Sequence, residues 1–153
     1  MVHRLVALVA FVMLASPPGH GQSAAAGPDL RGGWHAELYA LMTGERHPVK
    51  GMIVFTASEW NLTVFVTPDG KAPQRAAAEG GTYTLDGTTL ALRHLYRFSA
   101  GSALPGLPES PMRMEVDRTE APLEPITVTV EVERLTLSFP SGNSMTFRRS
   151  SRF

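Results

Sequence analysis

Histidine and tyrosine alternate with leucine in the segment LALRHLYRF, residues 90–98. Every second residue of a β-strand points to the same side, so His94 and Tyr96 share a face with the apolar residues, and the arginines, Arg97 among them, point the other way. We expect both side chains on the interior of a barrel strand, with Tyr83 of the partner strand beside them. A mostly apolar cavity with a few hydrogen-bonding groups is the usual composition of a small-ligand site.

A structural explanation competes with ligand binding for these residues. A buried His94 and Tyr96 that bond only to the backbone would produce the same alternation. Met112 and Met114 are flexible side chains that suit a permissive pocket, but methionine also serves as ordinary core. The sequence predicts His94, Tyr96, Tyr83 and Met114 as ligand contacts and leaves the structural role open.

Motifs that carry catalysis are missing from this sequence. It has no cysteine, no G-x-S-x-G nucleophile elbow, no H-E-x-x-H zinc motif and no glycine-rich phosphate loop. The histidines after residue 26 are His35, His47 and His94, and none is spaced from another as metal-ligand pairs are. We therefore expect no metal, no cofactor and no enzymatic activity. An isomerase or cyclase would need an interior acid–base pair, for which His94 and Tyr96 are the only candidates.

The elements that must position these residues are β-strands. From residue 30 onward apolar residues recur with period two, in runs separated by turn-forming residues. Asp86-Gly87 predicts the tight turn of a hairpin. Residues 73–79, which two glycines follow, predict one short helix. The expected strands lie within residues 34–42, 49–57, 60–66, 81–98, 112–118, 126–139 and 145–149.

Many short strands with one apolar face indicate an antiparallel all-β fold. Such a sheet must curl into a barrel or fold over as a sandwich. We expect an antiparallel up-and-down β-barrel of about 8–10 strands with one short helix.

The first 26 residues have the order of a secretory signal peptide. Arg4 supplies a short positive head, an apolar run follows over residues 5–15, and small residues ending at Ala26 fit a cleavage site. The run is too short to cross a bilayer, which takes about 20 residues, although an uncleaved anchor is the alternative. Cleavage after Ala26 would leave 127 of the 153 residues, a single domain over residues 27–153, in the periplasm or outside the cell.

Composition limits the possible partners. Acidic and basic residues number 14 each, so the chain has no net charge, whereas a protein that follows phosphates usually has a basic surplus. We therefore expect no nucleic-acid partner. An exported chain without cysteine is neither a disulfide scaffold nor a lipid-modified lipoprotein. Without such an anchor we expect no stable membrane insertion once the leader is removed.

Gly32-Gly33-Trp34 reads as G-x-W at the start of the first strand. This resembles the lipocalin and calycin signature, in which the tryptophan closes one barrel end and packs against an arginine of the last strand. Over roughly residues 30–150 the chain also resembles the bacterial lipocalin-like domain family, although Gly33 replaces the more usual threonine. The resemblance lies in the order of the segments GMIVFTASEWNLTVFV, GGTYTLDGTTLALRHLYRF, VERLTLSF and MTFRR. The resemblance implies a calycin-type barrel with a pocket, closed by Trp34 and Arg149.

Three functional hypotheses follow from these observations. The first is an exported lipocalin-like barrel that binds a small hydrophobic or amphipathic molecule inside. The second is an interaction module with a filled barrel, which would use loops such as residues 101–111 against an unknown envelope protein. The third, ranked last, is an isomerase- or cyclase-type barrel. A cavity in the interior would favour the first hypothesis over the second.

Overall fold

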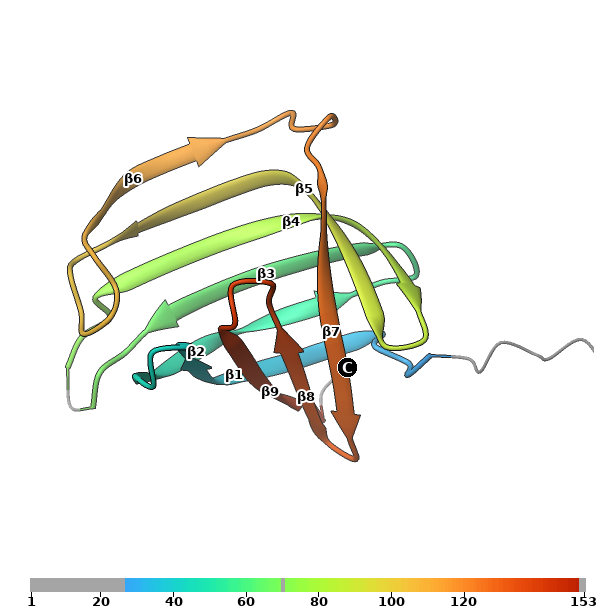
Figure 1. The fold of residues 1–153 in the computed structure, drawn as a ribbon, viewed down its shortest axis with the longest axis horizontal. Coiled ribbons are helices and arrows are strands. Elements are labelled where there is room, and N and C mark those ends of the chain that lie inside the picture. The colour runs from blue at the N-terminus through green and yellow to red at the C-terminus, as the bar shows by residue number, and fades with distance from the viewer. Residues whose placement is uncertain (1–26, 70, 152–153) are drawn as a thin grey trace, which may run out of the picture.

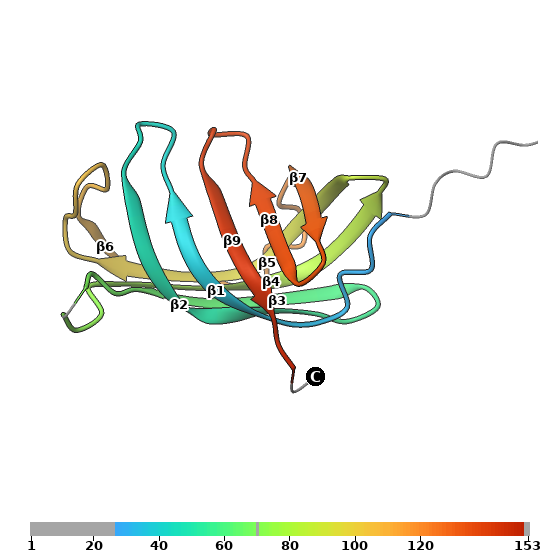
Figure 2. The same cartoon turned by 90° about the horizontal axis from the view of Figure 1, so that it is seen from below.

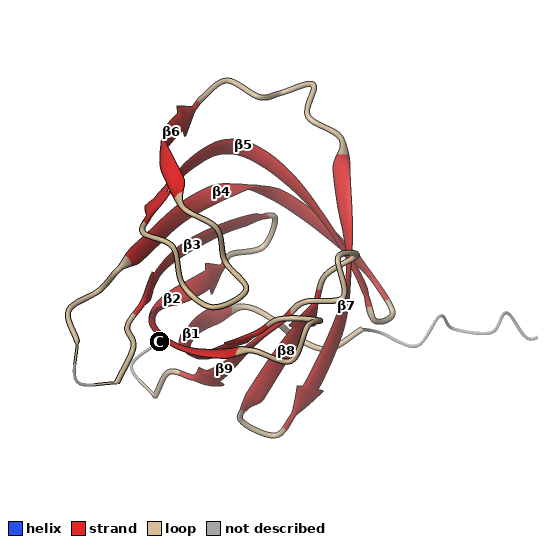
Figure 3. Ribbon diagram, turned by 60° about the vertical axis from the view of Figure 1, so that its left-hand side comes forward, coloured by secondary structure: helices blue, strands red, loops and turns tan. Residues whose placement is uncertain are grey.

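The computed structural model describes residues 27–69 and 71–151, and the expected leader lies outside these residues. The described residues form nine β-strands and no helix (Figure 3). None of them forms a helix that is long and apolar enough to cross a membrane. The strands are β1 (Gly32–Ala40), β2 (Arg46–Phe55), β3 (Glu59–Val66), β4 (Arg75–Asp86), β5 (Thr89–Gly101), β6 (Ser110–Glu115), β7 (Leu123–Glu131), β8 (Arg134–Ser138) and β9 (Ser144–Arg149).

Eight of these strands form a closed antiparallel barrel. The strand order is β4-β3-β2-β1-β9-β8-β7-β5, and β4 also pairs with β5, which closes the ring (Figures 1 and 2). Strands that follow one another in the chain are neighbours, apart from β6, which pairs with β5 alone. The predicted up-and-down barrel is therefore confirmed, with β6 as an additional strand. The hairpin predicted at Asp86-Gly87 is also confirmed, and Gly87 has the positive φ of 57° that its turn requires.

The short helix expected over residues 73–79 is wrong. From Arg75 onward this segment is β4, which pairs with β3 on one side and β5 on the other. A helix of about seven residues has little stability of its own. Pairing with two strands therefore prevails over the helix propensity of the three alanines that follow Arg75.

β5 has different neighbours along its length. Residues 89–93 pair with 123–127 of β7, and residues 97–101 pair with 110–115 of β6. In Figure 1, β6 runs along β5 while β7 runs away from it toward β8 and β9. The eight-stranded ring is therefore completed beside the first half of β5, and β6 replaces β7 beside the second half.

A β-bulge in the middle of β5 reverses which side chains face the interior. Gly80 pairs with Tyr96 and Gly81 with His94, which leaves Leu95 as the extra residue. Gly81 leaves no room for a side chain against the backbone of β5, and Gly80 makes room for the Tyr96 ring. A Cβ on Gly81 would lie 1.9 Å from a carbonyl oxygen of β5, and one on Gly80 would lie 2.2 Å from the Tyr96 hydroxyl. Even-numbered residues of β5 face inward before the bulge, and odd-numbered residues face inward after it.

The interior is tightly filled at the end of the barrel where β1 begins, which we call the closed end. The opposite end, which we call the open end, carries the β1–β2, β3–β4 and β8–β9 turns and the β5–β6 loop. In Figure 2 the β1–β2 and β8–β9 turns project in the same direction. The most completely buried large side chains come from strand segments near the closed end and from the residues that cross it: Leu30, Trp34, Ile53, Phe55, Leu90, Ile126, Val128, Leu135 and Phe147.

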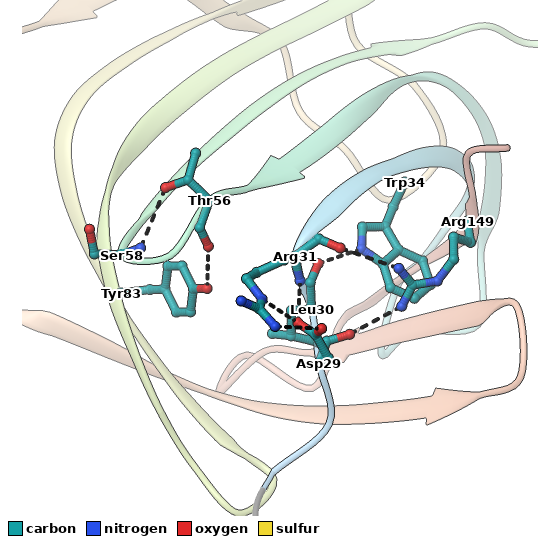
Figure 4. A network of polar contacts seen from close by, with 8 residues as sticks. All are labelled: Asp29, Leu30, Arg31, Trp34, Thr56, Ser58, Tyr83 and Arg149. Atoms are coloured by element: carbon teal, nitrogen blue, oxygen red, sulfur yellow. Dashed lines mark hydrogen bonds and ion pairs between the residues drawn. The ribbon is translucent and has the colours of Figure 1, made fainter. Parts of the chain in front are cut away.

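Trp34 and Arg149 close the filled end together (Figure 4). They are direct cross-strand partners on β1 and β9, and the Arg149 Cζ atom lies 4.1 Å from the indole centroid. The indole Nε1 donates a hydrogen bond of 2.8 Å to the Leu30 carbonyl. The guanidinium donates to the carbonyls of Asp29, at 3.1 Å, and Arg31, at 3.2 Å. This is the tryptophan–arginine contact that the sequence predicts, and it also holds the first described residues across the closed end.

Replacing Arg149 should destabilise the barrel far more than replacing its neighbour. We expect Arg149→Met to lower the free energy of unfolding by about 2 kcal/mol, because it removes a cation–π contact and two charge-assisted hydrogen bonds. Arg148→Met is the matched control: Arg148 is exposed and pairs with Glu37 on the surface, which contributes less than about 1 kcal/mol. Urea unfolding followed by tryptophan fluorescence measures both. Equal losses would contradict the closing role of Arg149.

Candidate functional site: a cavity in the open half of the barrel

The open half of the barrel contains a cavity of about 330 Å³. This volume lies within the usual range for small-molecule sites, about 300–1,000 Å³. Most of the wall is aliphatic, and a few polar side chains also reach it. The apolar lining includes Val49, Leu62, Val64, Val66, Ala77, Leu107 and Met145, and the polar side chains are Tyr39, Arg75, Glu79, Arg97, Ser99 and Ser110.

Small residues on β4 and β5 leave this space unfilled. Ala77 pairs with Ser99 in the β4–β5 register, and both line the cavity. At the closed end, by contrast, the inward positions hold Trp34, Phe55 and Phe147, which fill the interior. The same barrel is therefore packed at one end and hollow at the other because of the size of its inward side chains.

His94 lies between two carboxylates next to the cavity. Its Nδ1 is 2.8 Å from Oε2 of Glu79, and its Nε2 is 2.9 Å from Oε2 of Glu124. Trp60 packs edge-on against the imidazole, with the ring centroids 5.0 Å apart. Hydrogen bonds to Glu124 and Glu79 raise the pKa of His94 to about 9, so at neutral pH the imidazolium donates to both. The cluster links three neighbouring strands, because β4 and β7 flank β5 in the sheet.

Glu79 belongs both to this cluster and to the cavity wall. Burial by itself raises the pKa of its carboxyl group. The hydrogen bond from His94 and the positive charges of His94, Arg97 and Arg118 act in the opposite direction and outweigh burial, so the pKa is lowered from its ordinary 4.5. Glu79 is therefore ionised at neutral pH, and it shares the positive charge of the imidazolium with Glu124.

Of the four predicted ligand contacts, only His94 lies in the interior near the cavity. Tyr83 lies at the closed end, where its ring packs against Phe55 and its hydroxyl donates to the Thr56 carbonyl at 2.8 Å (Figure 4). Its polar group is therefore already used to fix the β2–β3 turn.

The expected inward orientation of Tyr96 and Met114 is wrong. Tyr96 is 38 % exposed and hydrogen-bonds Asn61 on the outer face, because the bulge at Leu95 reverses the alternation. Met114 is 72 % exposed, and Met112 is 65 % exposed. Met114 pairs with Phe98 in the outward row of β5, and β6 itself lies outside the ring of eight. The acid–base pair of His94 and Tyr96 that an isomerase would need is not assembled, because the two side chains lie on opposite faces of β5.

Sequence reasoning missed the charged residues of the cavity wall, Arg75, Glu79 and Arg97, and the second carboxylate on His94, Glu124. Arg97 was expected on the outer face, and Glu79 at the end of a helix. The Gly80-Gly81 pair was a usable signal, since glycines inside a strand often mark a bulge. Glu124 could not be found in this way, because its contact with His94 depends on the pairing of β7 with β5.

The charged residues of the interior do not form a metal site. No group of three or more His, Cys, Asp or Glu side chains among residues 27–69 and 71–151 is arranged to hold a metal ion. In the cluster around His94, each imidazole nitrogen already faces its own carboxylate.

The fold and cavity define a closed antiparallel β-barrel with a hollow open half, an architecture consistent with a calycin-like barrel. In comparisons with known proteins, no family model, no curated protein and no solved structure matches the chain.

The ionised state of His94 should make stability depend on pH. Its folded-state pKa, about 9, is above the ordinary 6.5, so its contribution is complete below about pH 6.5 and is lost as the pH rises through 9. We expect this loss to approach about 3 kcal/mol, at about 1.4 kcal/mol per pKa unit, and to be missing in His94→Gln. Urea unfolding at a series of pH values measures it, with His35→Gln, at an exposed position on β1, as the control. Parallel curves for the wild type and His94→Gln would contradict the assignment.

Proposed function

We propose that this protein is a lipocalin-like barrel that binds a small amphipathic molecule in the open half of its interior. The observation that carries the proposal is the 330 Å³ cavity, whose aliphatic wall is interrupted by a few polar and charged side chains. An apolar ligand body gains affinity from such a wall, and a polar end finds partners among the charged groups.

The β5–β6 loop supports this proposal because it is fixed at the open end. Arg75 Nη1 donates to the carbonyls of Ser102 and Pro108, both at 2.7 Å. His47 Nε2 donates to the Pro105 carbonyl at 2.9 Å. Leu107, in the same loop, lines the cavity. The loop expected to contact another protein therefore forms part of the wall of the cavity.

The alternatives are less favoured by this arrangement. An interaction module with a filled barrel would need a packed interior, whereas the open half contains the cavity. Isomerase chemistry would need a proton-transfer pair on the cavity wall, and Tyr96 lies on the outer face.

Export completes the proposal. The order of charged, apolar and small residues in the first 26 positions supports a cleaved leader and a protein that resides in the periplasm or outside the cell. The order of motifs from Gly32-Gly33-Trp34 to Arg149 supports membership of the bacterial lipocalin-like domain family.

Filling the cavity should abolish ligand binding without unfolding the barrel. Ala77 lines the cavity, whereas Ala78, the next residue, lies in the outward row with Phe98 and Met114. We expect Ala77→Phe to weaken binding of the neutral fluorescent probe N-phenyl-1-naphthylamine by about tenfold or more, because the ring occupies the ligand volume. Ala78→Phe, the matched control, should bind as the wild type does.

Fluorescence titration of protein purified from an export-competent host measures these affinities, and the circular dichroism spectrum monitors the fold. Equal binding by Ala77→Phe and Ala78→Phe would place the probe outside the cavity and would contradict the proposed site.

The leader proposal makes its own prediction. Expression of the full chain in an export-competent host should yield a soluble protein that begins at Gly27, because Ala26 ends the small-residue cleavage site. Intact-mass spectrometry and N-terminal sequencing of the exported fraction measure this. A chain of the full 153 residues retained in the membrane fraction would support the uncleaved anchor instead.

A further inference from the structure

The two arginines of the cavity wall differ in what they bind. Arg75 is occupied by the protein, since its guanidinium donates to the carbonyls of Ser102 and Pro108 and thereby holds the β5–β6 loop. Arg97 has no such partner. Within the part of the chain that the structure describes, no acceptor lies within hydrogen-bond or ion-pair distance of its guanidinium.

The carboxylates opposite Arg97 are already paired with other cations. Arg97 is the direct cross-strand partner of Glu79 on β4 and of Glu115 on β6. Glu79 pairs with His94 at 2.8 Å, and Glu115 pairs with Arg118 at 3.0 Å. Neither carboxylate therefore pairs directly with the Arg97 guanidinium. In and beside the cavity wall, Arg75, His94 and Arg97 carry three positive charges against the two carboxylates of Glu79 and Glu124, so one positive charge remains.

This remaining charge faces the cavity. The charged residues of the wall are Arg75, Arg97 and Glu79, and Glu79 shares the imidazolium of His94 with Glu124. A charge in a partly buried, mostly apolar cavity is unfavourable unless it is paired. An anion supplied by a ligand would pair it, and one free guanidinium matches a head group with a single negative charge.

We propose that Arg97 is the anchor for the carboxylate of an amphiphilic acid, whose aliphatic chain lies along the apolar wall that includes Leu62, Val64 and Met145. This inference rests on the proposed function, because it identifies the ligand class of the same cavity. A guanidinium presents two parallel N–H donors that fit the two oxygens of a carboxylate. At about 30 Å³ per water-sized group, the cavity holds about 11 such groups, which corresponds to a chain of about ten carbons.

The test compares decanoate with decan-1-ol, which share the chain and differ in the charge of the head group. Each competes with N-phenyl-1-naphthylamine for the exported protein at neutral pH. We expect the wild type to bind decanoate at least about tenfold more tightly than decanol, in line with charge-assisted hydrogen bonds of about 1.5–3 kcal/mol. Arg97→Met should reduce this ratio to about one by weakening decanoate alone. Arg113→Met, on the same sheet at an exposed position of β6, should leave the ratio unchanged.

A second measurement separates ligand anchoring from a structural role. Because the guanidinium of Arg97 has no hydrogen-bond or ion-pair partner in the described residues, Arg97→Met should keep or raise the free energy of unfolding in the absence of ligand, whereas a structural arginine would lower it.

The possible failures are distinguishable. If Arg97→Met leaves the ratio of decanoate to decanol affinity unchanged, the anchor is overturned while binding in the cavity stands. If both compounds bind equally to the wild type, the preference for an anion is overturned in the same way. If neither compound displaces the probe, and the probe binds Ala77→Phe as well as the wild type, the proposed function fails and the anchor fails with it.

Discussion

Closure of the sheet through β5 determines where the remaining elements lie. β5 pairs with β4 along its whole length, but it pairs with β7 only over residues 89–93 and with β6 only over residues 97–101. A closed ring has no free edge, so its inward side chains must fill the interior or leave a cavity. Where β7 flanks β5 the interior is packed, and where β6 flanks β5 it is hollow.

The bulge at Leu95 links this closure to the chemistry of the cavity. Without the extra residue, Tyr96 would face the interior and Arg97 would face solvent. With it, the second half of β5 presents Arg97 and Ser99 to the cavity. The bulge requires Gly81 in the neighbouring strand, because a Cβ there would lie 1.9 Å from the Arg93 carbonyl oxygen, and Gly80 makes room for the Tyr96 ring on the outer face. A glycine in β4 therefore permits the bulge that turns the polar side chains of Arg97 and Ser99 toward the cavity.

The charges inside the barrel are not fully balanced, and the imbalance determines which ligand charge the cavity favours. His94 is shared between Glu79 and Glu124, so one cation faces two carboxylates. Such a cluster is stable because each charge is hydrogen-bonded as well as paired. The pairing also removes Glu79 as a partner for Arg97, whose charge is then directed at the cavity. The interior is thus apolar over most of its surface, and the three cations Arg75, His94 and Arg97 exceed the two carboxylates by one positive charge.

The sequence by itself determined the class of fold, the hairpin at Asp86-Gly87 and the contact of Trp34 with Arg149. The first two follow from period-two alternation and turn chemistry, which are local, and the third is what the resemblance to the lipocalin signature implies. Only the tertiary structure decided the side on which Tyr96, Arg97 and Met114 lie. One inserted residue reverses the alternation of a strand, and whether it is inserted depends on the register of β5 against β4. Likewise, an apolar side chain on β6 becomes core only if the strand joins the ring, and that depends on pairing between distant segments.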